Sequence, residues 1–464
     1  MRFLLPIEPR HIRLRGAAAV LEDAFRELGI ETVTSRSHGA VSRTPVDVVF
    51  GESADFIASD FETASAIISI DGRAPELPIG WERRDYLRAG PPDRPTLFID
   101  TSRRVRTYVA RRWSRPTSRR ARLRNRAIAS PAFRFASKLT VAGTAPLIPY
   151  PLQVAATAAK LPATGTCFLQ LGSGDDLQRV VMQAFDPTRP QPTWVTKFSR
   201  VSGAPDRSDR EFRVLAHLRD SGPNVEQHLP RLLAQFPLHD SQAIVESAAP
   251  GTVLTAHLRA AGSNNARAMY EAALQWAIDL SVTTKQVRTN EVDGELSQLL
   301  EEWGGSGIRS RLTEVPQCVA HNDLGTWNIQ TDGRTFTVVD WESASIAGLP
   351  IGDVAYLVSD ALAVLYGPED DDERAQWCCQ LWRGDLDVSQ VAFEWLARAA
   401  NALGISVDAA SALVTVSWLR HGLSQERRAT FLSGKEANEG YLGKVSSYWM
   451  NDSKLGFDWV AYAS

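Results

Sequence analysis

One stretch of this sequence constrains the fold more than any other. It consists of the polar segment 321–328 and, shortly after it, the segment 338–342. Between them, residues of high β-propensity stand on either side of an Asp-Gly pair at 332–333. Asp-Gly between two such runs is a strong signal for a β-hairpin with a tight turn. Because a hairpin folds back on itself, we expect the residues that enter it to lie beside those that leave it.

The expected hairpin gathers Asp323, Asn328 and Asp340, three residues with a shared chemistry. Phosphoryl transfer needs an oriented acceptor hydroxyl, metal ions bridging the phosphates, and positive charge on the phosphate oxygens. The Asn328 amide and the Asp340 carboxylate offer the hard oxygen ligands that Mg²⁺ prefers. Asp323 is the candidate carboxylate that orients the hydroxyl and accepts its proton. The three residues therefore suggest transfer of a phosphoryl group from a metal-bound nucleotide.

The motifs around these residues resemble those of a known enzyme family. The pattern H-x-D-x-x-x-x-N, a hairpin, and then two apolar residues before Asp-Trp-Glu resembles the aminoglycoside phosphotransferase/choline kinase family of protein-kinase-like enzymes. Residues 350–355 also resemble the segment of that family that follows the metal-binding Asp. The resemblance covers roughly residues 155–450 and leaves the first 140 residues outside it.

The resemblance implies a role for each matching residue in the expected hairpin region. Asp323 would be the catalytic base, and His321 would brace the catalytic loop rather than react. Asn328 and Asp340 would hold Mg²⁺ against the nucleotide. The cofactors implied are ATP or GTP together with Mg²⁺, and the partner implied is a small molecule that offers a hydroxyl group.

The smaller lobe of this family carries a Lys on its third strand and a Glu on the next helix. Lys197 and Glu211 stand at the matching positions, where a buried Glu would hold the Lys ammonium for the nucleotide phosphates. Glu246 and Ala248 lie in a segment that resembles the hinge whose backbone would meet the adenine.

The loop between the first two expected strands of that lobe is a second candidate for nucleotide binding. Gly172 and Gly174 would permit close approach of the backbone to phosphate, or serve only as turn residues. Asp175 and Asp176 follow directly, and their negative charge would oppose a phosphate at this place.

The fold class expected is an α/β N-terminal domain followed by an α+β, two-lobed protein-kinase-like domain. Residues 1–100 alternate apolar runs with helical patterns, which predicts a small α/β domain with a partly parallel sheet. An Arg-rich helical segment and linker should occupy 101–150, a β-rich N-lobe 151–250, and a mostly helical C-lobe 251–464. Strands are expected at 3–7, 46–50, 67–70, 96–99, 168–171, 179–185, 194–198, 232–236 and 243–246, and helices at 17–28 and 208–218.

The formal net charge of −3 conceals a basic segment, because residues 101–138 hold twelve Arg, one Lys and no acidic residue. A basic amphipathic helix at 103–126 could lie on an anionic membrane surface, contact nucleic-acid phosphates without sequence specificity, or grip a phosphorylated ligand. The alternative is a solvated linker helix that pairs with the acidic remainder of the chain. The apolar face of the expected helix consists of Val105, Tyr108, Val109 and Trp113.

Two further features bear on substrate and location. The acidic run 369–373 could bind a cationic acceptor such as an amino sugar, or could start a helix, where acidic side chains suit the dipole. Location is a separate question. No apolar run approaches the roughly 18 residues that span a bilayer, and residues 1–9 lack the apolar region of a signal peptide. The four cysteines form no CxxC pair, which argues against a zinc site or a disulfide scaffold. A cytoplasmic protein is expected, with peripheral membrane contact left open.

The function favoured is ATP- and Mg²⁺-dependent transfer of a phosphoryl group to a sugar, amino sugar, aminoglycoside or amino alcohol. One alternative is a nucleotide-binding regulatory module that serves the first domain without turnover, although the presence of Asp323, Asn328 and Asp340 argues against it. The other alternative places a sugar-transfer or sugar-binding activity in residues 1–140, which only their α/β pattern supports.

Overall fold

The structure is a computed structural model, and it divides the chain into two compact units. The first unit consists of Met1–Ser208 and Arg231–Ala248, and the second of Asp209–Pro230 and Ala249–Ser464. The residues described are all except 1, 6, 17, 19–21, 23–30, 36–45, 53, 57, 72, 74, 90–95, 111–137, 145, 172–178, 201–206, 261–263, 287–299, 302–305, 313–314, 432–443, 446–447 and 449–464.

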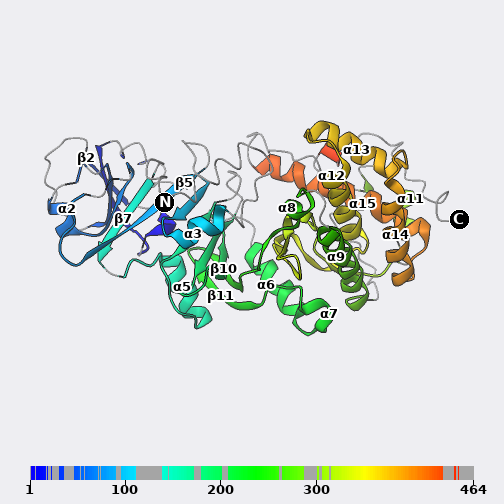
Figure 1. The fold of residues 1–464 in the computed structure, drawn as a ribbon, viewed down its shortest axis with the longest axis horizontal. Coiled ribbons are helices and arrows are strands. Elements are labelled where there is room, and N and C mark those ends of the chain that lie inside the picture. Colours follow the sequence, from blue (N-terminus) through cyan, green and yellow to red (C-terminus); the bar gives the residue numbers. More distant parts are fainter. Residues whose placement is uncertain are drawn as a thin grey trace. The chain divides into compact units, whose positions relative to one another are not determined.

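A twelve-stranded sheet is the framework of the first unit (Figure 1). Its strand order is β11-β12-β10-β9-β8-β6-β5-β7-β4-β3-β1-β2, and only β2, β1, β3 and β4 run parallel to one another. The strands are β1 His11–Arg15, β2 Glu31–Ser35, β3 Val46–Gly51, β4 Ala64–Ser69, β5 Trp81–Ala89, β6 Leu97–Asp100, β7 Lys138–Thr144, β8 Cys167–Gln170, β9 Val180–Phe185, β10 Pro192–Phe198, β11 Leu232–Leu238 and β12 Ser241–Ser247. Helices α2 Ala58–Thr63, α3 Arg103–Tyr108 and α5 Tyr150–Ala159 accompany them.

The sheet runs without interruption from the predicted first domain into the predicted N-lobe. Strands β6 and β8 pair antiparallel, with Phe98 opposite Leu169. One core cluster lies along this sheet and includes Ile12 from β1, Leu169 from β8 and Val245 from β12. Residues 101–150 therefore do not separate two domains, since β7 from this range pairs with both β4 and β5.

Most of the expected strands are confirmed, with boundaries that differ by a few residues. The strand expected at 3–7 is wrong, because Arg2–Leu4 form a 3₁₀ helix whose Phe3 and Leu4 side chains enter the core. Strand β1 was missed because it carries charge: the buried Arg13 and Arg15 share the buried carboxylate of Asp60, at 2.9 and 2.8 Å. Strands β2, β5 and β7 were missed as well, and the helix expected at 17–28 lies almost entirely outside the described residues.

The second unit is mostly helical and is built around α12 (Gly352–Tyr366), in which every side chain from Asp353 to Ala363 is buried. Helix α12 contacts α8, α9, α13, α14 and α15. The β-rich first unit and the helical second unit agree with the expected fold class. The other elements are α6 Arg207–His217, α7 Pro223–Glu226, β13 Thr252–Val253, α8 Leu254–Leu258, α9 Asn264–Thr283, α11 Ser306–Arg311, β14 Cys318–Ala320, β15 Ile329–Thr331, β16 Phe336–Val338, β17 Ser345–Gly348, α13 Asp371–Arg383, α14 Ser389–Leu403 and α15 Val407–Phe431, with 3₁₀ turns η5 Leu218–Asp220, η6 Thr326–Asn328 and η7 Trp341–Ser343.

In the described part of the chain, no single helix has the length and apolar character needed to cross a membrane. One bent pair, Ser389–Leu403 with Val407–Gly422, passes the same test of length and composition when its two helices are taken together.

Candidate active site

The predicted hairpin is confirmed, and it brings the candidate metal ligands together. Strands β15 and β16 pair antiparallel, with Ile329 opposite Val338, and Gly333 takes the positive φ of +91° that the turn requires. At the open end, the Val339 N–H donates to the Asn328 carbonyl at 2.8 Å. Asp340 follows Val339 directly, so Asn328 and Asp340 lie at the same end of the hairpin.

The loop that carries Asp323 is held by carboxylates from the buried helix α12. Asp353 accepts the backbone N–H groups of His321 and Asn322, at 2.6 and 2.8 Å. Asp360 accepts the N–H of Thr326 at 2.6 Å. Neither carboxylate was predicted from the sequence, although the spacing of 353, 356 and 360 places these residues on one face of a helix and was a usable signal.

His321 lies between this loop and the end of β16. Its ring lies 3.1 Å from the Val339 carbonyl through Nε2 and packs against the ring of Trp341 at 4.7 Å. Burial lowers the pKa of His321, so the imidazole is neutral and Nε2 carries the proton donated to Val339. His321 thereby connects the start of the loop with the end of β16.

The carboxylate of Asp323 is fixed from two sides. Asn328 Nδ2 donates to the Asp323 carbonyl at 2.8 Å and to Oδ2 at 3.0 Å, and the Tyr356 hydroxyl donates to Oδ1 at 3.3 Å. Burial and the nearby negative charges of Asp340 and Glu342 raise the pKa of Asp323 to about 8, against the opposite effect of the two hydrogen bonds. The site thus concentrates negative charge that a cation would offset.

The donor set at the hairpin fits Mg²⁺. Both Nδ2 contacts of Asn328 go to Asp323, which leaves Oδ1 as the amide oxygen for a metal. Asp340 adopts a left-handed conformation (φ 71°, ψ 58°) at the start of the turn η7 and contributes a carboxylate. No group of three or more His, Cys, Asp or Glu side chains able to hold a metal occurs among the described residues. An amide and a carboxylate are hard oxygen donors of the kind that Mg²⁺ takes when phosphate and water complete its shell.

Glu211 supports the candidate metal site by a contact that the sequence did not suggest. Its buried carboxylate accepts the Trp341 N–H at 3.0 Å through Oε1. Because Trp341 follows Asp340, this bond fixes the backbone next to a candidate metal ligand. The predicted pair of Glu211 with Lys197 joins residues of different units and stays a prediction.

Lys197 and Glu246 form a buried ion pair within the first unit, with Nζ 2.8 Å from Oε2. The pair joins the neighbouring strands β10 and β12. The sequence suggested Glu246 only as a hinge residue, because local pattern does not reveal the strand register that brings the two side chains together. The Ala248 N–H, expected at the adenine, donates to the Thr193 carbonyl at 3.1 Å, so an adenine contact through it would require that bond to break.

Two other predicted features fall wholly or partly outside the described residues. Gly172 and Gly174 lie there, as do the acidic residues Asp175 and Asp176. The Arg-rich segment is described only up to residue 110.

In the described part of the Arg-rich segment, the side chains of the expected apolar face pack into the core of the first unit. Val105, Tyr108 and Val109 are buried in a cluster with Phe185, and the rings of Tyr108 and Phe185 meet edge to face at 5.3 Å. These three side chains are therefore not available to a membrane. Any peripheral membrane contact stays a prediction for residues 111–126.

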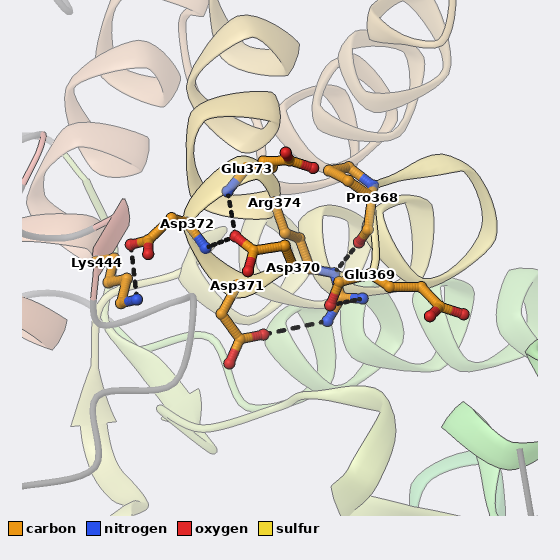
Figure 2. A network of polar contacts seen from close by, with 8 residues as sticks. All are labelled: Pro368, Glu369, Asp370, Asp371, Asp372, Glu373, Arg374 and Lys444. Atoms are coloured by element: carbon orange, nitrogen blue, oxygen red, sulfur yellow. Dashed lines mark hydrogen bonds and ion pairs between the residues drawn. The ribbon is translucent and has the colours of Figure 1, made fainter. Parts of the chain in front are cut away.

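The acidic run 369–373 forms the start of helix α13, as Figure 2 shows. Asp370 caps the helix by accepting the N–H groups of Asp372 and Glu373 at 2.9 and 3.1 Å. Arg374 Nε donates to the Pro368 carbonyl at 2.8 Å, and Lys444 pairs with Asp372 at 2.6 Å. These contacts support the helix-start interpretation over a site for a cationic acceptor.

Replacing Asp370 with Ala should lower the free energy of unfolding by about 1 kcal/mol, because two N–H groups at the helix start lose their acceptor. Glu369→Ala is the matched control, since it removes the same charge from an exposed neighbour that caps nothing. Urea unfolding measures both variants. An equal loss of acceptor affinity in the two variants, with stability unchanged, would instead favour a binding role for the acidic run.

Asn322 is a further residue of the candidate site, and it was not predicted from the sequence. It has a positive φ of +63°, and its side chain donates to the Ser343 carbonyl at 2.9 Å and accepts from Arg420 at 3.1 Å. Asn tolerates this backbone conformation better than most residues other than Gly. Asn322 thus ties the residue before Asp323 to the turn after β16 and to helix α15.

Substitutions at Asn322 should separate the contribution of its side-chain hydrogen bonds from the effect of its positive φ. Asn322→Gly removes the side-chain bonds and should cost about 1–2 kcal/mol of stability. Asn322→Ala loses the same bonds and adds the strain of a side chain at positive φ, which should cost about 1 kcal/mol more. Chemical denaturation measures the difference, and an Ala variant as stable as the Gly variant would show that no strain is present.

Comparison with known protein families gives one match. Residues 184–385 match the model of a family described as the phosphotransferase enzyme family, which confirms the resemblance over that range. No curated protein matches the sequence.

Several solved structures resemble this chain at low sequence identity and low TM-score. A Ralstonia eutropha JMP134 protein assigned as an aminoglycoside phosphotransferase has 13% identity and a TM-score of 0.40, covering 64% of this chain and 94% of its own. A choline/ethanolamine kinase family protein from Mesorhizobium loti has 15% identity and a TM-score of 0.34, covering 65% and 95%. The ADP-bound aminoglycoside phosphotransferase APH(2'')-Ib has 14% identity and a TM-score of 0.35, covering 60% and 90%. At these values the likeness assigns no substrate to this chain.

Proposed function

We propose that this chain, whose residues 184–385 match the phosphotransferase family, transfers the γ-phosphoryl group of ATP or GTP to a hydroxyl of a small molecule. One observation carries the proposal. Asp323 is held by Asn328 at the open end of the hairpin, where the backbone also places Asp340. A carboxylate for the acceptor hydroxyl thus adjoins two oxygen ligands for the metal of the nucleotide.

In the proposed reaction, Asp323 orients the acceptor hydroxyl and takes its proton. The acceptor oxygen forms a bond to the γ-phosphorus, while the bond from that phosphorus to the β,γ-bridging oxygen breaks. Asn328 and Asp340 would hold Mg²⁺, which would offset the negative charge of the phosphates during transfer. Glu211 fixes the backbone after Asp340, and Lys197 would supply positive charge to the phosphates.

The acceptor is proposed as a hydroxyl compound of the sugar, amino sugar, aminoglycoside or amino alcohol class. The purified full chain, supplied with Mg²⁺ and either ATP or GTP, should be screened against a panel of such compounds. Mass spectrometry should find one class of acceptor heavier by one phosphoryl group, with an equal amount of nucleoside diphosphate released. Nucleotide binding without product from any acceptor would overturn the proposal in favour of a regulatory module.

A further inference from the structure

Tyr356 contacts the carboxylate oxygen of Asp323 that Asn328 does not hold. Its hydroxyl donates to Asp323 Oδ1 at 3.3 Å, while Asn328 Nδ2 holds Oδ2 at 3.0 Å. The two donors come from different elements, since Tyr356 belongs to helix α12 and Asn328 closes the turn η6. Both oxygens of the carboxylate therefore accept a hydrogen bond, and each donor limits the rotation of the carboxylate about its Cβ–Cγ bond.

The ring of Tyr356 is locked in place by other aromatic side chains. It stacks on His421 of α15 at 4.2 Å with an angle of 13° between the rings, and it meets Trp327 edge to face at 5.9 Å. Burial lowers the pKa of His421 to about 3, so this imidazole is a neutral stacking partner. Tyr356 is only 6% exposed, and these contacts fix the direction in which its hydroxyl points.

We propose that Tyr356 is a positioning residue that sets the plane of the Asp323 carboxylate for the acceptor hydroxyl. The inference rests on the proposed function of Asp323. A carboxylate held by Asn328 alone could turn about its Cβ–Cγ bond, and catalysis by proton acceptance depends on the geometry of the accepting oxygen. The hydroxyl of Tyr356 limits that rotation through its hydrogen bond to Oδ1.

The test is Tyr356→Phe, which keeps the ring and its stacking and removes only the hydroxyl. Tyr366→Phe is the matched control, because it deletes an equivalent hydroxyl from the same helix at a position that is 53% exposed. We expect Tyr356→Phe to lower kcat about tenfold, the lower end for loss of a hydrogen bond to a charged group. KM for the nucleotide and Tm should stay near the values of the unaltered protein, and Tyr366→Phe should change none of these quantities.

The possible outcomes separate the inference from the function on which it rests. An active protein whose Tyr356→Phe variant keeps kcat within twofold overturns the role of Tyr356 alone. A lower kcat accompanied by a similar loss of nucleotide affinity and a lower Tm would also overturn it, because that pattern indicates a structural role. An unaltered protein that phosphorylates no acceptor overturns the proposed function, and the positioning role with it.

Discussion

Replacing Asp323 with Asn should lower the rate of phosphoryl transfer by about 10²–10⁴-fold while nucleotide affinity changes little. The amide has nearly the same shape as the carboxylate but cannot accept the proton of the acceptor hydroxyl. Steady-state kinetics and calorimetric titration with nucleotide measure the two effects. Asp387→Asn is the control, since it makes the same change at an exposed position.

Stability should respond to Asp323→Asn in the opposite direction from activity. Burial and the charges of Asp340 and Glu342 raise the pKa of Asp323 from 3.8 to about 8, so the metal-free folded state disfavours the charged form. Between about pH 4 and 8 the unfolded chain ionises this carboxyl while the metal-free folded state keeps it protonated, so stability falls progressively as pH rises through this range. In that range and with a chelator present, the Asn variant should unfold at an equal or higher urea concentration than the unaltered protein. For the activity measurement, a normal rate of phosphoryl transfer by Asp323→Asn would show that Asp323 does not act in the proposed mechanism.

Replacing Arg84 with Ala should destabilise the whole first unit by about 2–4 kcal/mol. Arg84 Nη1 lies 2.8 Å from Asp100 Oδ2 and 3.5 Å from Thr166 Oγ1, so it connects β5, β6 and the residue before β8. Its loss would leave the Asp100 carboxylate, which is 5% exposed, with the Ser102 N–H at 2.8 Å as its remaining hydrogen bond among those described. A buried charge that loses its counter-ion carries a large free-energy cost.

Arg83→Ala is the matched control for this experiment, because Arg83 is the adjacent residue of β5 and is 56% exposed. Its ion pair with Asp85 spans 3.8 Å at the surface and should contribute less than about 0.5 kcal/mol. Urea unfolding followed by circular dichroism measures both variants. If the two variants have similar urea midpoints, the pairing of β6 with β8 does not depend on the Arg84 contact. If unfolding shows two separate transitions, the sheet is not one cooperative structure.

The shared sheet also changes how the first 140 residues are interpreted. The sequence suggested a separate α/β domain with a possible sugar-related activity of its own. In the structure these residues share a sheet and a core with strands β8 to β12. The first part of the chain is therefore a structural component of the unit that carries Lys197 and Glu246.

The sequence by itself determined the features that depend on short-range pattern. The hairpin was readable because the turn signal and both flanking runs lie within a few residues, and it necessarily gathered Asn328 and Asp340. Most expected strands were confirmed for the same reason, since runs of β-prone residues between turn signals are local. The family match over 184–385 agrees with the motifs read around Asp323.

Only the tertiary structure decided which distant residues meet. The pairing of β6 with β8, the Lys197–Glu246 ion pair and the contact of Glu211 with Trp341 join segments far apart in the sequence. Such contacts depend on strand order and register, and a shift of one residue would turn every side chain of a strand to the other face. The local sequence pattern does not determine strand order or register. The sequence therefore indicated the candidate site residues, and the packing of α12 and the twelve-stranded sheet decided what holds them in place.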